Sequence, residues 1–150
     1  MHYVLENYIN GIGYLNLSEK GAEARLMAHE VVKGLPELTK VFGSEVSLAY
    51  ENKWAGSTDL VCEFKGKPTI LDFKQSNKPK REEWIEDYYY QIAAYSLAHK
   101  KQYGDIKQGV IAMCTPNLVF QRFIMDESTL AEYEEKWFEK IEKFYRHIQP

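Results

Sequence analysis

Two periodicities of apolar residues alternate along this sequence, and their order restricts the chain to a fold that mixes strands with helices. Val46, Leu48 and Tyr50 alternate with less apolar neighbours, which is typical of a strand. Residues 58–64 and 69–74 predict a second and a third strand, joined by a turn at Lys65-Gly66-Lys67-Pro68. The continuous apolar run 110–114 predicts a buried strand, and residues 118–124 predict one more. The sequence therefore predicts five strands.

Three stretches have helical periodicity. The first opens at Ser18, and we expect it to end with Gly34 in a left-handed conformation before Pro36. Its apolar positions are Ala24, Leu26, Met27, Ala28, Val31 and Val32. A second helix is predicted over about 82–101, with acids at its start and lysines at its end, as the helix dipole favours. Asp126 or Ser128 is expected to cap a final amphipathic helix that runs to residue 145.

The order of helix, three strands, helix, two strands and helix predicts one α/β domain over residues 1–150. A chain of 150 residues with 45% hydrophobic content can build one hydrophobic core. No apolar run approaches the ~20 residues that span a bilayer, which excludes a transmembrane helix. The first residues lack the basic and apolar stretches of a secretory signal, so we expect a cytoplasmic protein.

Charge and cysteine content narrow the classes of function. Residues 65–81 hold six basic residues and one acid, whereas residues 126–142 hold seven acids and two lysines. Any polyanion must therefore bind to a local basic patch and not to the whole molecule, whose net charge is −3. Cys62 and Cys114 are expected to be free thiols, and two cysteines cannot hold a four-cysteine iron–sulfur cluster.

The candidate chemistry lies on the second and third strands. Asp72 and Lys74 are two residues apart in one strand, so their side chains leave the same face. A hairpin with two central turn residues, Gly66-Lys67, or with four would place Asp59 on that face, opposite or diagonally across. Two carboxylates at this spacing can bind one divalent cation.

Each of these residues has a structural alternative. Asp72 and Lys74 alone are equally consistent with a cross-strand salt bridge on a solvated face. Gln91 and Tyr95 lie one helical turn apart, which suits either a hydrogen-bonded pair against the core or a pair that faces the carboxylates.

Three segments in order resemble the PD-(D/E)XK nuclease superfamily. They are Gly56-Ser57-Thr58-Asp59, then Ile70-Leu71-Asp72-Phe73-Lys74-Gln75-Ser76-Asn77-Lys78-Pro79-Lys80, then Gln91-Ile92-Ala93-Ala94-Tyr95. The RecB-like exonucleases are the most similar group, especially those of phages and those that maintain mitochondrial genomes. The resemblance implies a restriction-endonuclease-like core with a central mixed five-stranded sheet flanked by helices.

The resemblance also implies a site. Asp59, Asp72 and the backbone carbonyl of Phe73 would bind Mg²⁺ or Mn²⁺, and Lys74 would orient or help deprotonate the attacking water. Gln91 and Tyr95 match the Q-x-x-x-Y element that supports the active site. The expected contacts with nucleic acid are Ser76, Asn77, Lys78, Lys80 and Arg81, together with Trp84 and Tyr88 as stacking residues. Trp84 and Tyr88 also fit the core-facing side of the predicted helix.

One departure from the family pattern affects the metal site. RecB-like members carry a metal-binding histidine on the first helix, and Arg25 occupies that position here. His29, one turn later, and Glu30 are the candidates to replace it. The resemblance implies a metal-dependent DNA exonuclease of phage or bacterial recombination or repair that prefers single-stranded ends. The alternatives are a catalytically silent nucleic-acid-binding or inhibitory module, and an endonuclease subunit whose specificity domain lies on another chain.

Overall fold

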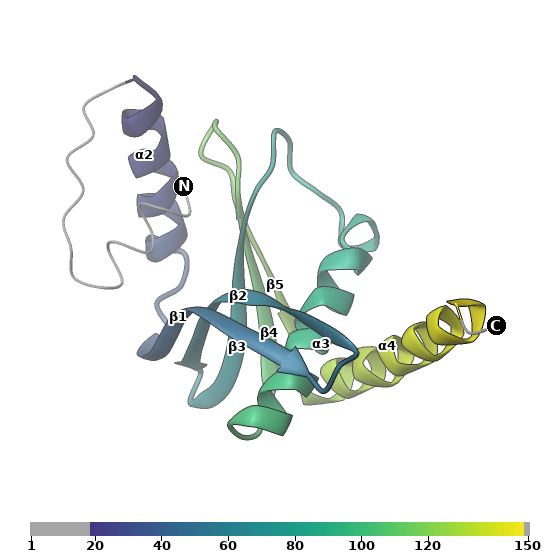
Figure 1. Ribbon diagram of the computed structural model, residues 1–150. Coiled ribbons are helices and arrows are strands. Elements are labelled where there is room, and N and C mark those ends of the chain that lie inside the picture. Colours follow the sequence, from purple (N-terminus) through teal and green to yellow (C-terminus); the bar gives the residue numbers. More distant parts are fainter. Residues whose placement is uncertain (1–18, 149–150) are drawn as a thin grey trace.

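A computed structural model describes residues 19–148 as a mixed sheet with helices on both faces (Figure 1). The elements are α2 (Glu19–Lys33), β1 (Leu38–Tyr50), β2 (Trp54–Phe64), β3 (Lys67–Gln75), the 3₁₀ turn η1 (Glu82–Trp84), α3 (Glu86–Gln102), β4 (Gln108–Cys114), β5 (Phe120–Met125) and α4 (Glu127–Ile148). The prediction on a secretory signal concerns residues outside this range. Within it, no helix is long and apolar enough to cross a membrane.

The sheet has the strand order β1-β2-β3-β4-β5. Only β3 and β4 are parallel, and α3 makes the crossover between them, as parallel neighbours require. The other three pairs are antiparallel. The predicted mixed five-stranded sheet flanked by helices is therefore confirmed.

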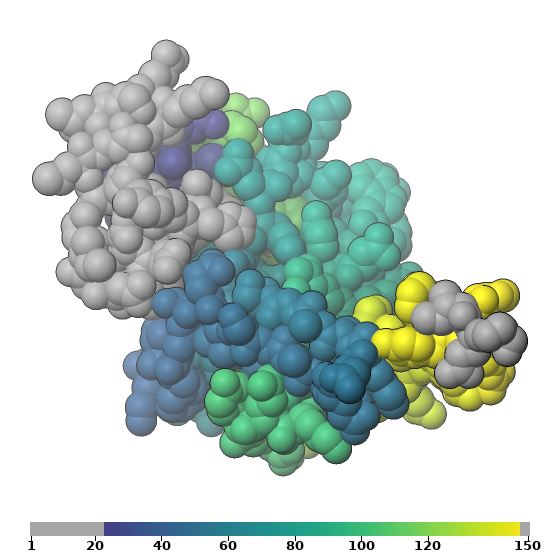
Figure 2. Space-filling model, viewed as in Figure 1, coloured from purple at the N-terminus to yellow at the C-terminus, as the bar shows by residue number. Residues whose placement is uncertain are grey.

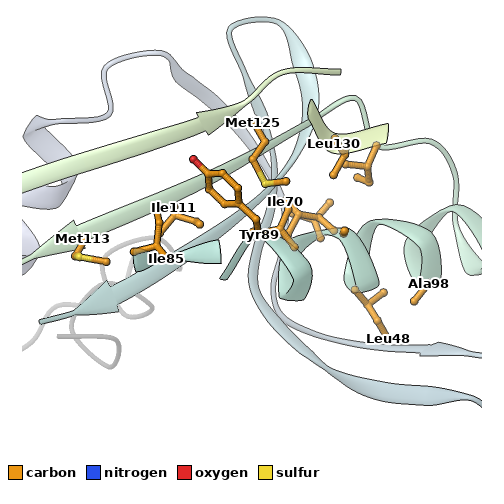
Figure 3. Close-up of a cluster of buried hydrophobic side chains, with 13 residues drawn as sticks. Leu48, Ile70, Ile85, Tyr89, Ala98, Ile111, Met113, Met125 and Leu130 are labelled. Carbon is orange, nitrogen blue, oxygen red and sulfur yellow. The ribbon is translucent and has the colours of Figure 1, made fainter. Parts of the chain in front are cut away.

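Alternation along β3 sends its side chains into two different layers. Leu71 and Phe73 join the buried cluster that α2 covers. Ile70 joins the cluster beneath α3, and Figure 3 shows it with Ile111, Met113 and Met125 as members of that cluster. Asp72 and Lys74 continue the row of Ile70, so they lie on the α3 side of the sheet.

The turn between β2 and β3 differs from the predicted one. Phe64 pairs with Lys67, so the two central residues are Lys65 and Gly66 and not Gly66 and Lys67. Both have positive φ, 54° and 74°, as a type I′ hairpin turn requires. The two-residue turn sets the register that later brings the aspartates together.

Two helix ends also differ from expectation. Gly34 does not have the positive φ of Gly66 or Gly104; an ideal Cβ built on it would lie 2.3 Å from the Phe120 ring, so its lack of a side chain is used for packing. The predicted helix over 82–101 is interrupted at Ile85, whose side chain is buried. Trp84 thereby leaves the helix and is 61% exposed, so its assignment to the core is wrong.

β1 begins at Leu38, well before the alternation that starts at Val46, whereas the start of α4 and the state of the cysteines follow the prediction. Asp126 accepts a hydrogen bond from the Thr129 amide at 2.8 Å, which confirms it as a cap of α4. Cys62 and Cys114 are both free and buried. Burial raises the pKa of the Cys62 thiol to about 12, so that thiol is unreactive at neutral pH.

Candidate active site

The two aspartates meet where the ladder between β2 and β3 gives way to side-chain hydrogen bonds. The paired register of these strands runs from Phe64–Lys67 to Leu60–Leu71. At the next position the Asp59 amide donates to Asp72 Oδ1 at 3.4 Å, and the Phe73 amide donates to Asp59 Oδ2 at 2.8 Å. Each carboxylate thus accepts from the backbone of the opposite strand, which holds the two acids side by side.

Asp72 is a buried carboxylate, and burial disfavours its charged form. It is 3% exposed, and its Oδ1 also accepts a weak hydrogen bond from the Thr58 hydroxyl at 3.5 Å. Its buried Oδ2 accepts no hydrogen bond, although Lys74 Nζ lies 3.3 Å away as an ion pair. Burial raises the pKa of Asp72, the charge of Asp59 raises it further, and Lys74 opposes both.

Lys74 is held by groups from β3 and α3. Its ammonium donates to Gln91 Oε1 at 3.0 Å and lies 4.8 Å from the centre of the Tyr88 ring. Gln91 Nε2 donates in turn to the Tyr95 hydroxyl at 3.4 Å. Gln91 and Tyr95 are thus hydrogen-bonded to each other, with Gln91 in contact with Lys74 and Tyr95 packed against the core cluster beneath α3.

Gly56 explains how Tyr95 reaches this network. An ideal Cβ on Gly56 would lie 2.7 Å from the Tyr95 hydroxyl and 2.9 Å from its ring. No side chain larger than hydrogen fits there without displacing the tyrosine. The glycine that opens the first motif thus gives α3 its close approach to β2.

The two carboxylates suit a divalent cation, although no third acidic or imidazole side chain joins them within residues 23–147. Mg²⁺ is commonly bound by one or two carboxylates with water and substrate oxygens, and the buried Oδ2 of Asp72 without a hydrogen bond is an acceptor that a cation would satisfy. Among residues 23–147, whose side chains are described, no cluster of three or more His, Cys, Asp or Glu side chains could hold a metal.

The expected replacements for the missing histidine do not join the aspartates. His29 is exposed on α2, as is Arg25. Glu30 lies near the end of β4, where burial raises the pKa of the Cys114 thiol and the charge of Glu30 raises it further. Cys114 points into the cluster beneath α2, on the other side of the sheet from Lys74. The structure therefore brings together Asp59, Asp72, Lys74, Gln91 and Tyr95 without His29.

The segment after β3 contains most of the predicted nucleic-acid contacts, and it is anchored at both ends. Ser76 donates through its amide to the Cys114 carbonyl at 3.2 Å and through its hydroxyl to the Lys78 carbonyl at 2.6 Å. Gln121 of β5 forms two hydrogen bonds of 2.8 Å with the backbone of Lys80. Asn77, Lys78 and Lys80 are exposed.

Trp84 and Tyr88 lie in different environments. Trp84 is exposed and stacks against Arg81, whose guanidinium carbon lies 5.2 Å from the ring centre. Tyr88 is half-buried beneath Lys74. Sequence reasoning missed Thr58 and Gln121, because their contacts depend on register and on pairing across the sheet and leave no local pattern.

Comparison with known proteins places the chain in a family. Residues 2–149 match the model of the PD-(D/E)XK nuclease superfamily, and the chain belongs to that superfamily. It is 29% identical over 118 residues to mitochondrial genome maintenance exonuclease 1 of Mus musculus, which covers 73% of this chain and 34% of the mouse protein.

One solved structure with a TM-score above 0.5 shares the fold. A candidate exonuclease from Eubacterium rectale superposes with a TM-score of 0.59 at 14% identity, covering 97% of this chain and 64% of that one. The alkaline exonuclease LHK-Exo from Laribacter hongkongensis gives a TM-score of 0.46 at 12% identity, over 96% of this chain and 80% of that one. The chain spans about a third of the mouse protein and less than two thirds of the Eubacterium protein.

Proposed function

We propose that this chain is a metal-dependent DNA exonuclease that hydrolyses phosphodiester bonds. The observation that carries the proposal is the meeting of Asp59, Asp72 and Lys74 at one point of the sheet, with a buried Asp72 oxygen that lacks a hydrogen bond. A salt bridge on a solvated face would need no such burial, and it would not require a glutamine on α3 to hold the lysine.

The proposed roles follow from the contacts. Asp59, Asp72 and the Phe73 carbonyl would hold Mg²⁺ or Mn²⁺, which supplies a water of lowered pKa and neutralises charge at the phosphorus. Lys74 Nζ lies 3.3 Å from Asp72 Oδ2, and it would position the attacking water and bind a phosphate oxygen. Gln91 and Tyr95 would keep the ammonium of Lys74 in place.

The strand leading to this point would be bound by the segment after β3. Its exposed lysines and the Arg81–Trp84 pair offer phosphate and stacking contacts in the segment that directly follows the strand of Asp72. Exonuclease activity is supported by the name of the mouse relative, and action at single-stranded ends by these stacking groups. A single domain over 1–150, and a role in phage or bacterial recombination or repair in the cytoplasm, stay predictions.

The test is digestion of DNA labelled at one end, single-stranded and duplex, with Mg²⁺, with Mn²⁺ or with EDTA. We expect metal-dependent shortening from one end of the single strand, and products that report its direction. Internal fragments would favour an endonuclease. Absence of cleavage with either metal would contradict the proposal.

A silent nucleic-acid-binding module is the second candidate. The observation that favours it is that no third acidic or imidazole side chain joins the two aspartates within residues 23–147. Retained DNA binding without cleavage in the same experiment would support it.

A further inference from the structure

A pocket of about 310 Å³ lies against the candidate active site, between the β1–β2 hairpin, α3 and α4. We call it the aromatic pocket; the residues that define it are Trp54, Tyr90, Gln91, Tyr95, Trp137 and Lys140. Figure 2 shows the blue surface of the β1–β2 hairpin meeting the yellow surface of α4. This volume is at the lower end of the range for small-molecule sites, so it suits one ring system and not a longer segment.

The aromatic walls are fixed before anything binds. Trp54 stacks on Tyr50 with ring centres 4.2 Å apart, and its indole N–H donates to the Ala94 carbonyl at 2.9 Å. Trp137 meets Trp54 edge to face at 5.6 Å. A pocket with preformed walls loses little side-chain freedom on binding.

The polar groups of the pocket suit a nucleotide. Lys140 Nζ lies 4.1 Å from the centre of the Tyr90 ring and offers a cation for a phosphate beside the pocket. The carboxylate of Asp87 also lines the pocket and can accept from an exocyclic amine.

The pocket is separated from Lys74 by a single side chain. Gln91 accepts the hydrogen bond from Lys74 on one side and lines the aromatic pocket on the other. Tyr95, which accepts from Gln91, lines it as well. A ligand in the pocket therefore lies beside the position where the scissile phosphate would contact Lys74.

We propose that the aromatic pocket binds one unpaired nucleobase of the DNA strand, next to the phosphate that lies at Lys74. The proposal rests on the proposed function for its substrate. A base in duplex DNA is paired and stacked between its neighbours, so it can enter this pocket only after its base pair opens. The pocket thus selects strands with unpaired ends.

Binding of single-stranded oligonucleotides with one abasic position tests this proposal. The abasic position is moved stepwise from the end, and affinity is measured by fluorescence anisotropy in EDTA. We expect one position to weaken binding about tenfold, the size of one lost base–aromatic contact. Equal affinity at all positions, or absence of DNA binding, would overturn the proposal.

Variants connect that position to the pocket. Ala94→Leu adds bulk to the pocket from the face of α3 that carries Asp87, Tyr90 and Gln91, and Lys140→Met removes its cation. In the Ala94→Leu variant, the loss of affinity should no longer depend on the position of the abasic site. Ala131→Leu, on an exposed face of α4, should preserve that dependence. Lys140→Met should weaken binding of the intact strand more than Lys143→Met, a substitution of an exposed lysine on the same helix, and circular dichroism of both variants checks that they fold.

The same measurements distinguish failure of the pocket proposal from failure of the proposed nuclease function. If Ala94→Leu abolishes a position-dependent loss of affinity in a protein that cleaves no DNA, the pocket proposal stands and the nuclease proposal fails. If the protein cleaves DNA but its binding does not depend on the abasic position, or the dependence survives in Ala94→Leu, the nuclease proposal stands and the pocket proposal fails.

Discussion

Gln91 Oε1 accepts a hydrogen bond from Lys74 Nζ at 3.0 Å, so a residue of α3 fixes an ammonium that β3 presents. The helix that makes the crossover between the two parallel strands is thereby also part of the candidate site. This arrangement explains why the third motif lies so far along the chain from the second.

Gln91→Leu tests this relationship. The substitution keeps the side-chain size but removes the acceptor, so the ammonium of Lys74 is no longer held in position. We expect the single-turnover rate at saturating DNA to fall about tenfold or more, with metal dependence retained. Gln91→Glu keeps an acceptor and should retain more activity than Gln91→Leu; equal losses in the two variants would contradict a positioning role.

Gly56→Ala should destabilise the fold and reduce cleavage, because its Cβ would overlap Tyr95. Overpacking of this kind typically costs about 1–3 kcal/mol of unfolding free energy. In a Tyr95→Leu background the nearest atoms are gone, and the added cost of Gly56→Ala should nearly vanish. Urea unfolding of the four proteins measures this coupling, and additive effects would show that the two residues are not in contact.

Lys78→Ala combined with Lys80→Ala should weaken DNA binding and flatten its dependence on salt. Loss of two phosphate contacts lowers the slope of log K against log salt by about 1.8 for duplex or about 1.4 for single strands. The matched control is Lys33→Ala with Lys143→Ala, exposed lysines outside this segment. An unchanged slope in the first pair would mean that the basic segment does not contact phosphates.

Glu134 gives a prediction for stability against pH. Its carboxylate bridges α4 to Lys100 of α3 at 2.9 and 3.0 Å, yet burial raises its pKa, with a smaller contribution from Asp105. The folded state therefore binds this proton more tightly than the unfolded state, so the stability from protonation is full below about pH 4.5 and is lost as pH rises.

Glu134→Gln removes this titration while keeping an oxygen for Lys100. We expect its unfolding free energy to increase relative to wild type as pH rises from 4 to 7. Thermal or urea unfolding across that range measures the difference. A difference that shrinks with pH would show that the Lys100 ion pair outweighs burial.

Much of this fold could be predicted from local patterns. Alternation on β3 correctly separated Asp72 from Leu71 and Phe73, because side-chain direction in a strand depends on position alone. The start of β1 at Leu38 could not be seen, since register shifts between Leu38 and Lys40 and between Val41 and Gly43 break its alternation.

The candidate site was predictable in its members but not in its contacts. The motif spacing named Asp72, Lys74 and Gln91, and the structure brings them together. The aromatic pocket left no motif, because Trp54 and Trp137 are far apart in sequence and meet only when α4 packs against α3 and the β1–β2 hairpin. Contacts of that kind depend on tertiary packing, which periodicity does not encode.

Single-turnover cleavage of end-labelled single-stranded DNA by Asp72→Asn and Asp126→Asn tests the central claim most directly. Both variants exchange one carboxylate for an amide of equal size, and Asn remains a good cap of α4 at Asp126. We predict that Asp72→Asn folds and loses cleavage by on the order of 100-fold or more, whereas Asp126→Asn stays close to wild type. Cleavage by folded Asp72→Asn at the wild-type rate would contradict the assignment of this site.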